Sequence, residues 1–329
     1  MDLRDRFSIE HPVLQAGMGG GVSGADMATA VTNAGGLGTV GFASAKDFDR
    51  EIARTKAATQ GKTYAANLLL PFTLRAHVDA ILKHKVPVIS MFCGFDATIM
   101  RAVKDSGALI IYQIGSEEEA ARVVAAGADA LIVQGIEAGG HVRGKERLAS
   151  IFPKVRARHT NIPVIAAGGI HDRQSTANAM ALGADGVASG TRFLMTNESG
   201  AHEAYKSLLV AESETILTTL FGLGWPEPHR VLINDAVKRW CNDRGEPRTA
   251  IRILNWLTQF GAKYAPPGMA QKMMQSQRVN RPFFTPMLAA AGMDAPVLQA
   301  LAAYAGECVR EIHSVEPAAA VVESLAAGC

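Results

Sequence analysis

VVAAGADALIV at residues 123–133 and AMALGADGVAS at residues 179–189 share one construction. In each, an alanine-rich helical segment ends at a glycine, a tight turn carries an aspartate, and a short apolar strand follows. Glycine tolerates the left-handed backbone that closes a helix. Two copies of the same helix-to-strand joint predict a protein built from repeated strand and helix units.

The alternation of strands and helices extends from residue 12 to about residue 212. Short apolar runs are separated by segments that carry charged residues on one face and Ala, Val, Ile or Leu on the other. The eight predicted strands are VLQA at 13, GLGTVGF at 36, YAANLLL at 64, VPVISMF at 86, ALIIYQIG at 108, ADALIVQGIE at 128, IPVIAAGGI at 162 and DGVASGTRF at 185. Eight parallel strands close into a barrel, whereas an open doubly wound sheet usually has fewer. We therefore predict an α/β protein with a TIM (β/α)8 barrel, and an open sheet is the alternative.

The chain loses this regular alternation beyond residue 212. We expect the barrel to span residues 1–212, and a helical cap that forms a substrate region to span residues 213–294, inserted near the eighth unit. Helices at residues 295–329 would then pack back on the barrel. The apolar cap side chains suit either a substrate pocket or a core. They are Trp225, Met273, Met274, Phe283 and Phe284.

The composition excludes several classes of partner. A net charge of +2, with no long run of Lys or Arg, argues against nucleic acid. The N-terminus is charged where a secretory signal is apolar, and no stretch is long and apolar enough to span a membrane. Four widely separated cysteines show no metal-ligand or redox spacing. We expect a cytoplasmic protein with reduced thiols and no metal.

A glycine cluster raises the question of a dinucleotide site. GGGVSG at residues 19–24 has the spacing of a Rossmann phosphate loop and lies between a strand and a helix. A Rossmann domain also needs an acidic residue at the end of the next strand. The first acid beyond that strand is Asp47, inside a charged helix start. We therefore reject a Rossmann domain.

The carboxyl ends of the barrel strands predict a different cofactor site, because barrel enzymes place their chemistry at those ends. AAGG and SGT follow strands seven and eight, where barrels frequently bind phosphate through backbone N–H groups. Asn67 and Gln113 lie near the ends of strands three and five, although amides also commonly cap loops. A phosphate cradle, two amides and an apolar Met18 fit FMN.

The motifs taken together resemble a known family. QAGMGGGVSGADMATAVTNAGGLGTVG, NLLL, EAGGHVRG, PVIAAGGI and SGTRFLMTNES are similar to the nitronate monooxygenases, formerly 2-nitropropane dioxygenases. That family shares its FMN barrel with flavin-dependent enoyl-acyl carrier protein reductases and NADH:quinone reductases. The resemblance covers nearly the whole chain. One position departs from it, since Glu307 stands where the family usually carries Gln.

The resemblance implies a set of site residues. His141, in the AGGH motif, would be the catalytic residue, and Arg143 would add a positive charge nearby. The residues implied to bind FMN are Ala16, Gly17, Met18, Asn67, Gln113, Gly139, Gly140, Ala167, Gly168, Gly169, Gly190 and Thr191. The other histidines, among them His77 and His229, are expected on solvated helices and peripheral connections.

The implied activity is oxidation of an alkyl nitronate or similar anion by O2 to a carbonyl compound and nitrite. Reduction of a quinone or an enoyl thioester by NAD(P)H on the same FMN barrel is the alternative. A non-catalytic flavin-binding barrel is a further alternative, which a histidine near the flavin disfavours. The sequence leaves the physiological substrate and the oligomeric state open, a homodimer included.

Overall fold

The computed structural model describes residues 2–260, 269–293 and 295–329. The chain divides into two compact units. Unit 1 comprises residues 1–137, 143–200 and 314–329, and unit 2 comprises residues 138–142 and 201–313. A short piece of the chain after the sixth barrel strand therefore belongs to unit 2, together with the long C-terminal excursion.

Unit 1 contains an eight-stranded sheet in the order β1-β9-β8-β6-β5-β4-β3-β2. All of its strand pairs are parallel. The strands are β1 (Val13–Gln15), β2 (Thr39–Val40), β3 (Ala65–Leu69), β4 (Val88–Phe92), β5 (Leu109–Ile114), β6 (Ala130–Gln134), β8 (Val164–Ala167) and β9 (Gly186–Ser189). A parallel bridge from Leu14 to Leu37 joins the two ends of this order. The sheet is closed, so the prediction of a TIM barrel is confirmed and the open-sheet alternative is wrong.

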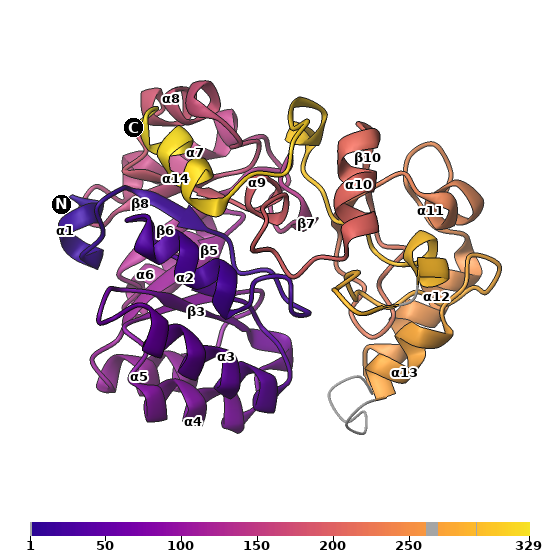
Figure 1. The fold of residues 1–329 in the computed structure, drawn as a ribbon, viewed down its shortest axis with the longest axis horizontal. Coiled ribbons are helices and arrows are strands. Elements are labelled where there is room, and N and C mark those ends of the chain that lie inside the picture. The colour runs from indigo at the N-terminus through magenta and orange to yellow at the C-terminus, as the bar shows by residue number, and fades with distance from the viewer. Residues whose placement is uncertain (1, 261–268, 294) are drawn as a thin grey trace. The chain divides into compact units, whose positions relative to one another are not determined.

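Helices surround the strands of unit 1 (Figure 1). They are α1 (Leu3–Phe7), α2 (Ala25–Asn33), α3 (Ala45–Ala58), the short 3₁₀ helix η1 (Leu70–Phe72), α4 (Arg75–His84), α5 (Ala97–Asp105), α6 (Glu117–Ala125), α7 (Leu148–Arg158), α8 (Arg173–Ala181), α9 (Thr191–Leu194) and α14 (Ala318–Ala326). Side-chain caps begin several of them; for example, Asp96 accepts from the N–H groups of Thr98 and Ile99. α14 packs against α2 and α8 and completes the helical ring after the long excursion. Residues 201–313 of unit 2 are therefore inserted in the chain between α9 and α14.

Alternation along the strands sorts the barrel core into two layers. Ala66 and Leu68 of β3 face the helices, in one cluster with side chains of α2, α3 and α4. Ala65 belongs to the inner cluster, with Val88, Ile111 and Ile165 of neighbouring strands. Since strand residues alternate, the residue types at inner positions decide what fills the barrel and what lines its carboxyl end.

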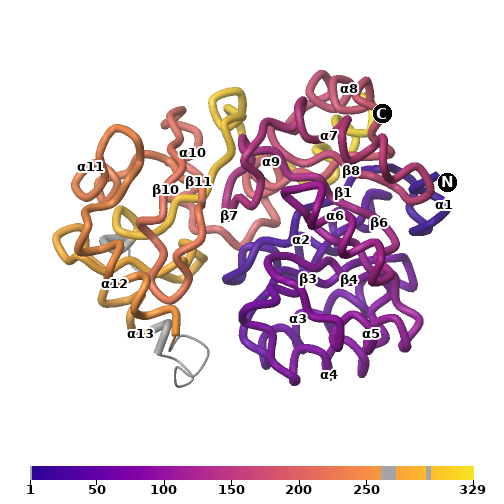
Figure 2. Tube along the Cα trace, turned by 180° about the vertical axis from the view of Figure 1, so that it is seen from behind, coloured from indigo at the N-terminus to yellow at the C-terminus, as the bar shows by residue number. Residues whose placement is uncertain are grey.

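Unit 2 is built on a three-stranded antiparallel sheet that the sequence analysis did not predict (Figure 2). Its strands are β10 (Thr215–Thr218), β11 (His229–Leu232) and β7 (Gly140–His141), in the order β10-β11-β7. The helices of the unit are α10 (Glu203–Ala211), α11 (Asp235–Trp240), α12 (Thr249–Thr258) and α13 (Met269–Ser276), with the 3₁₀ segments η3 (Ala295–Ala300) and η4 (Glu307–Glu311). Across the described part of the chain, every helix is too short or too polar to cross a bilayer.

Candidate functional site

The inner face of the barrel carries polar side chains toward the carboxyl ends of four strands. Asn67, Ser90, Gln113 and Gln134 each alternate with residues of the helix-facing cluster, so they lie on the inner face. We call these four residues the inner polar layer. Asn67 and Gln113 were predicted from the sequence, whereas Ser90 and Gln134 were not. The alternation of β4 and β6 was the signal that could have found them.

The amides of this layer differ in what they bind. Gln134 is 4% exposed, and its Oε1 accepts a hydrogen bond from the backbone N of Arg143 at 3.0 Å. Asn67 is 7% exposed. Within the described residues, neither the Asn67 nor the Gln113 amide caps a helix or a loop. Both amides therefore face the inner side of the barrel with their donors and acceptors available.

The AGM segment after β1 lies against Asn67. The backbone N–H of Ala16 donates to the carbonyl of Ser189 at 2.9 Å, which ties the segment to β9. A Cβ atom at Gly17 would stand 2.5 Å from the Cβ of Asn67. Met18 is half-buried and packs on the barrel core. Glycine at position 17 thus lets the backbone of the first strand end approach the Asn67 side chain.

Glycines follow β8, as predicted, and their backbone requires them. Gly168 has φ +120° and Gly169 has φ +73°, in the region that L side chains rarely adopt. Ala167, at the end of β8, accepts from the N–H of Gly135 at 2.9 Å. Gly190 caps α9, which starts at Thr191, and a Cβ there would meet the Ala16 Cβ at 3.7 Å. These turns leave backbone exposed that a larger side chain would cover.

Glu137 is a further residue of this region that the sequence analysis did not assign. It is 8% exposed, and its two carboxylate oxygens accept from the Leu148 N–H at 3.0 and 3.1 Å, at the start of α7. A Cβ at Gly168 would lie 3.4 Å from Glu137 Cγ. The Glu137 side chain therefore caps α7 and also lies next to the glycine turn after β8.

His141 belongs to unit 2, in the short strand β7. It pairs with His229 across the sheet, and Gly140 pairs with Arg230. Gly140 has φ +73°. A Cβ at Gly139 would collide with the backbone of Ala305 and Gly306. Both glycines of the AGGH motif are therefore required by the seating of this strand in unit 2.

Three rings surround the imidazole of His141. Trp225 stacks on it, with ring centroids 3.7 Å apart and planes 24° apart. His229 and Tyr304 are inclined to it, with centroids at 5.3 Å and 5.4 Å. We call Trp225, His229 and Tyr304 the aromatic box. Trp225 was expected in a pocket or core, whereas no role in a site was predicted for His229 or Tyr304.

His229 is completely buried, so its predicted place on a solvated connection is wrong. Its Nδ1 lies 2.9 Å from the carbonyl oxygen of Glu227, and its Nε2 lies 3.2 Å from the backbone N of Phe221. A carbonyl only accepts and an amide N–H only donates, so Nδ1 carries the proton and Nε2 accepts. His77 was also misplaced: it is 2% exposed and bonds to backbone through both ring nitrogens.

Burial sets the charge of His141 and His229. It lowers the pKa of His229 to about 4. The pKa of His141 lies well below 6.5, first because of burial and second because of the neighbouring His229. Loss of hydration disfavours the charged imidazolium. His141 is therefore a neutral imidazole at pH 7, able to accept a proton.

The nearby arginines are compensated by carboxylates. Arg143 Nη2 lies 2.5 Å from Glu119 Oε1, with both side chains largely buried. Arg230 Nη2 lies 3.2 Å from Glu307 Oε1, and the Arg230 side chain is 9% exposed. The unusual Glu307 thus forms an ion pair in unit 2. Neither arginine supplies an uncompensated positive charge.

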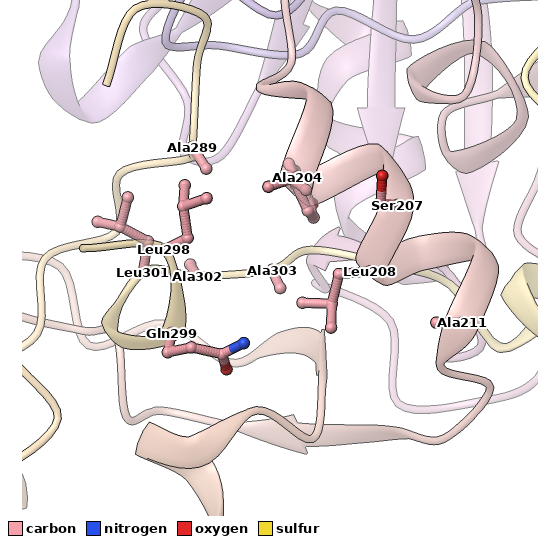
Figure 3. Close-up of a pocket in the computed structure, with 11 residues that line it drawn as sticks. Ala204, Ser207, Leu208, Ala211, Ala289, Leu298, Gln299, Leu301, Ala302 and Ala303 are labelled. Carbon is pink, nitrogen blue, oxygen red and sulfur yellow. The ribbon is translucent and has the colours of Figure 1, made fainter. Parts of the chain in front are cut away.

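Unit 2 also contains a cavity of about 370 Å³ (Figure 3). Alanine and leucine side chains of α10, together with Ala289 and residues 298–303, form most of its wall, with Tyr205, Ser207 and Gln299. The predicted pocket residues lie elsewhere: Met274 and Phe284 are buried, and the Phe284 ring packs on Phe221 and Trp240.

Known proteins resemble the chain over nearly its whole length. The family model described as nitronate monooxygenase matches residues 2–77 and 72–328. A (3aS,4S,5R,7aS)-5-hydroxy-7a-methyl-1-oxo-octahydro-1H-indene-4-carboxyl-CoA dehydrogenase of Rhodococcus jostii (strain RHA1) is 33% identical over 305 residues, 88% of this chain and 84% of the relative. A probable nitronate monooxygenase of Staphylococcus saprophyticus is 32% identical over 310 residues, 79% of this chain and 85% of the relative.

A solved structure extends the likeness to the fold. The nitroalkane oxidase of Streptomyces ansochromogenes superposes with a TM-score of 0.75 at 29% identity, over 99% of this chain and 97% of that chain. The match of the family model to almost every residue agrees with the closed barrel and with the AGGH strand described above. The chain is an enzyme and belongs to the nitronate monooxygenase family of flavin-dependent oxidoreductases.

Proposed function

We propose that the protein is an FMN-dependent oxidoreductase in which His141 accepts a proton from a carbon acid, with nitroalkanes and their nitronates as the first substrate class. The observation that carries this proposal is the packing of the His141 imidazole inside the aromatic box, where loss of hydration lowers its pKa and keeps it neutral. A general base must be unprotonated at working pH and fixed in place. His141 meets both requirements.

The barrel rim of unit 1 fits FMN by the chemistry of its donors. Gly168, Gly169 and Gly190 leave exposed backbone at the ends of β8 and β9, where N–H groups suit a phosphate. The amides of Asn67 and Gln113 suit the carbonyls and ring nitrogens of an isoalloxazine. Ala16, Gly17, Met18, Ala167 and Thr191 complete the unit 1 set that would hold the cofactor in this proposal. Gly139 and Gly140 are implied to bind it by the family resemblance alone. When bound, the flavin supplies the electron acceptor.

The charges in the structure favour a substrate that arrives neutral. Arg143 and Arg230 are paired with Glu119 and Glu307, and His141 is uncharged. A nitro group acidifies the neighbouring C–H bond, so a neutral nitroalkane can lose its proton to the His141 imidazole. Two such nitronates and one O2 then give two carbonyl compounds and two nitrite ions, so both oxygen atoms are used. A preformed nitronate enters the same sequence one step later.

A CoA thioester is the second candidate substrate, because the Rhodococcus relative is named as a dehydrogenase of a carboxyl-CoA compound. A thioester also acidifies its α C–H bond, so the same base serves. NAD(P)H-dependent reduction of a quinone or an enoyl thioester uses the same cofactor in the opposite direction. The two directions differ in whether the substrate gives electrons to the flavin or receives them.

Anaerobic mixing separates these activities. The purified protein is mixed in separate runs with nitroethane, ethyl nitronate, a saturated acyl-CoA, NADH and NADPH, while flavin absorbance is recorded. Reduction by nitroethane or its nitronate, followed by nitrite formation on admission of O2, supports the proposal. Reduction by acyl-CoA or by a pyridine nucleotide alone contradicts the first substrate class. Chromatography of the released flavin tests FMN independently.

A further inference from the structure

We propose that His229 is a positioning residue for His141, whose ring, fixed by the backbone, holds the His141 imidazole at one orientation on the face of Trp225. The inference rests on the proposed function, in which His141 is the base. It starts from a cross-strand pair: His229 of β11 stands opposite His141 of β7 in the antiparallel register. Side chains of directly opposed residues point to the same side of a sheet.

The ring of His229 cannot rotate without losing hydrogen bonds. Its Nδ1–H donates to Glu227 O, and its Nε2 accepts from the Phe221 N–H, as described above. Both partners are backbone groups, and the side chain is completely buried. A buried N–H or carbonyl that loses its partner is costly. The orientation and the tautomer of His229 are therefore fixed by the chain around it.

This fixed ring takes no part in proton transfer, because protonation of Nε2 would set two N–H groups against each other. Its contribution to His141 is a ring contact that restricts rotation of the His141 imidazole. Its plane is inclined by 62° to that of His141, whereas Trp225 is inclined by 24° and stacks. Tyr304 adds a third surface at 56°, and its Oη donates to the carbonyl of Pro286 at 3.1 Å. Rotation of the His141 ring would disturb all three contacts.

Holding the base has a functional consequence. A misplacement of about 1 Å can cost a catalytic group about 100-fold in rate. β7 contains two residues, one of them a glycine, so the strand itself fixes His141 weakly. The box supplies the constraint that the short strand lacks, and His229 is the member of the box that shares the sheet with His141.

His229→Ala and His229→Phe form a matched pair of variants. Both remove the two hydrogen bonds to Glu227 and Phe221, and they differ in whether a planar ring remains. The first readout is the imidazole NMR spectrum of the full-length protein, with the His141 signals assigned by their loss in His141→Gln. The second is kcat and KM with nitroethane. His77→Phe is the control, because His77 also bonds to backbone through both nitrogens and, among the described residues, makes no ring contact with His141.

We expect His229→Ala to raise the His141 pKa toward 6.5, to mix its tautomers, and to lower kcat about tenfold with KM nearly unchanged. His229→Phe should keep a single His141 tautomer, should raise the His141 pKa less than the Ala variant does, and should restore most of kcat. His77→Phe should leave both readouts unaltered. Unchanged His141 signals in His229→Ala would overturn the inference. Equal damage in the Phe and Ala variants would also overturn it, because the hydrogen bonds rather than the ring would then matter.

Two provisions keep the test decisive. If His229→Ala does not fold, His229→Leu fills the same volume without a planar ring and is judged by the same His141 signals. The NMR readout does not depend on turnover. A wild-type protein that does not oxidise nitroethane therefore contradicts the proposed function, while the signals of His141 still decide the role of His229.

Discussion

The imidazole of His141 stacks on the indole of Trp225, with ring centroids 3.7 Å apart. Burial alone makes His141 a weak base, because the imidazolium formed by proton transfer is poorly hydrated. The π face of the indole compensates in part, since a cation over a tryptophan ring in a desolvated site gains about 2 kcal/mol. Trp225 thus stabilises the charged form that exists only after the proton has moved.

Replacing Trp225 should therefore affect turnover more than substrate binding. Loss of about 2 kcal/mol in Trp225→Leu corresponds to a decrease of about 30-fold in kcat. Trp225→Phe keeps an aromatic face and should lose less than the Leu variant. Steady-state kinetics with nitroethane, with flavin content measured in each preparation, checks the order. Equal rates in the Leu and Phe variants would show that only bulk is needed at position 225.

Removal of the His141 imidazole tests the base itself. General base catalysis contributes roughly 10² to 10⁴ in rate, so His141→Gln should lose at least about 100-fold with nitroethane. A preformed nitronate needs no base, so its oxidation should decrease much less. The ratio of the two rates is the measurement, and flavin content is the control. Equal losses on both substrates would assign His141 a different role.

The pH dependence of the reaction follows from the lowered pKa of His141. The free base is the active form, and it is fully populated above 6.5. With a nitroalkane kept below its own pKa, kcat/KM should stay level from about pH 6.5 upward and fall only in more acidic buffer. A fall that begins above pH 6.5 would mean that His141 is hydrated in the working enzyme.

Protein stability should depend on pH through His229. Its pKa is about 4 in the folded protein against an ordinary 6.5, so below 6.5 the unfolded chain binds a proton that the folded chain does not. The stabilisation is complete above pH 6.5 and is lost as the pH falls toward 4, by about 3 kcal/mol in all.

Tryptophan fluorescence can follow this loss within one part of the molecule. Trp225, Trp240 and Trp256 all lie in unit 2, so urea unfolding followed by their emission reports that unit. His229→Phe should unfold at lower urea at pH 7 and show a shallower pH dependence, since His141 then remains as the one histidine of the box with a lowered pKa. An unaltered pH dependence in that variant would contradict the low pKa of His229.

The binding of a nitronate should not depend on the charge of Arg143. Its guanidinium is paired with Glu119, and a largely buried pair of this kind carries no net charge to offer an anion. Arg143→Gln should therefore change KM for ethyl nitronate less than about threefold, although it leaves a partly buried carboxylate and lowers stability. A much larger increase in KM would mean that the pair opens to bind the nitronate.

The barrel could be predicted from the sequence because its information is local. Each strand lies in a short apolar run, glycine follows every strand except β3 within two residues, and every predicted run contains one of the eight observed strands. Two of the four residues of the inner polar layer, Asn67 and Gln113, were predicted, because each stands near the end of a predicted strand. Ser90 lies within β4 and can be recognised only once the inner face of that strand is known.

The aromatic box could not be predicted because it depends on the pairing of two strands, β7 and β11, that lie far apart in the sequence. His141 and His229 are brought together by β7, a strand of two residues with no periodicity of its own. β10 and β11 mix polar and apolar residues on a small sheet, so neither gives a clear strand pattern. The EAGGHVRG motif identified His141. The residues that surround its ring lie far along the chain, between residues 225 and 304, and no local pattern links them to His141.

The glycine turn after β8 provides the last test, on the cofactor. Gly168 and Gly183 both have positive φ, +120° and +89°, and a Cβ at either would meet its nearest neighbour at 3.4 Å or more. Alanine at either position thus adds similar backbone strain, of about 1 kcal/mol. The two glycines differ in position, because Gly168 follows β8 at the carboxyl end of the barrel and Gly183 follows α8.

Gly168→Ala should bind FMN at least about tenfold more weakly, because the shifted turn and the added methyl group would cover N–H groups that suit a phosphate. Gly183→Ala should melt at a similar temperature and bind FMN as the wild type does. Fluorescence titration of the flavin-free protein with FMN measures the affinity of each variant. Equal affinities in the two variants would show that the phosphate does not bind at this turn.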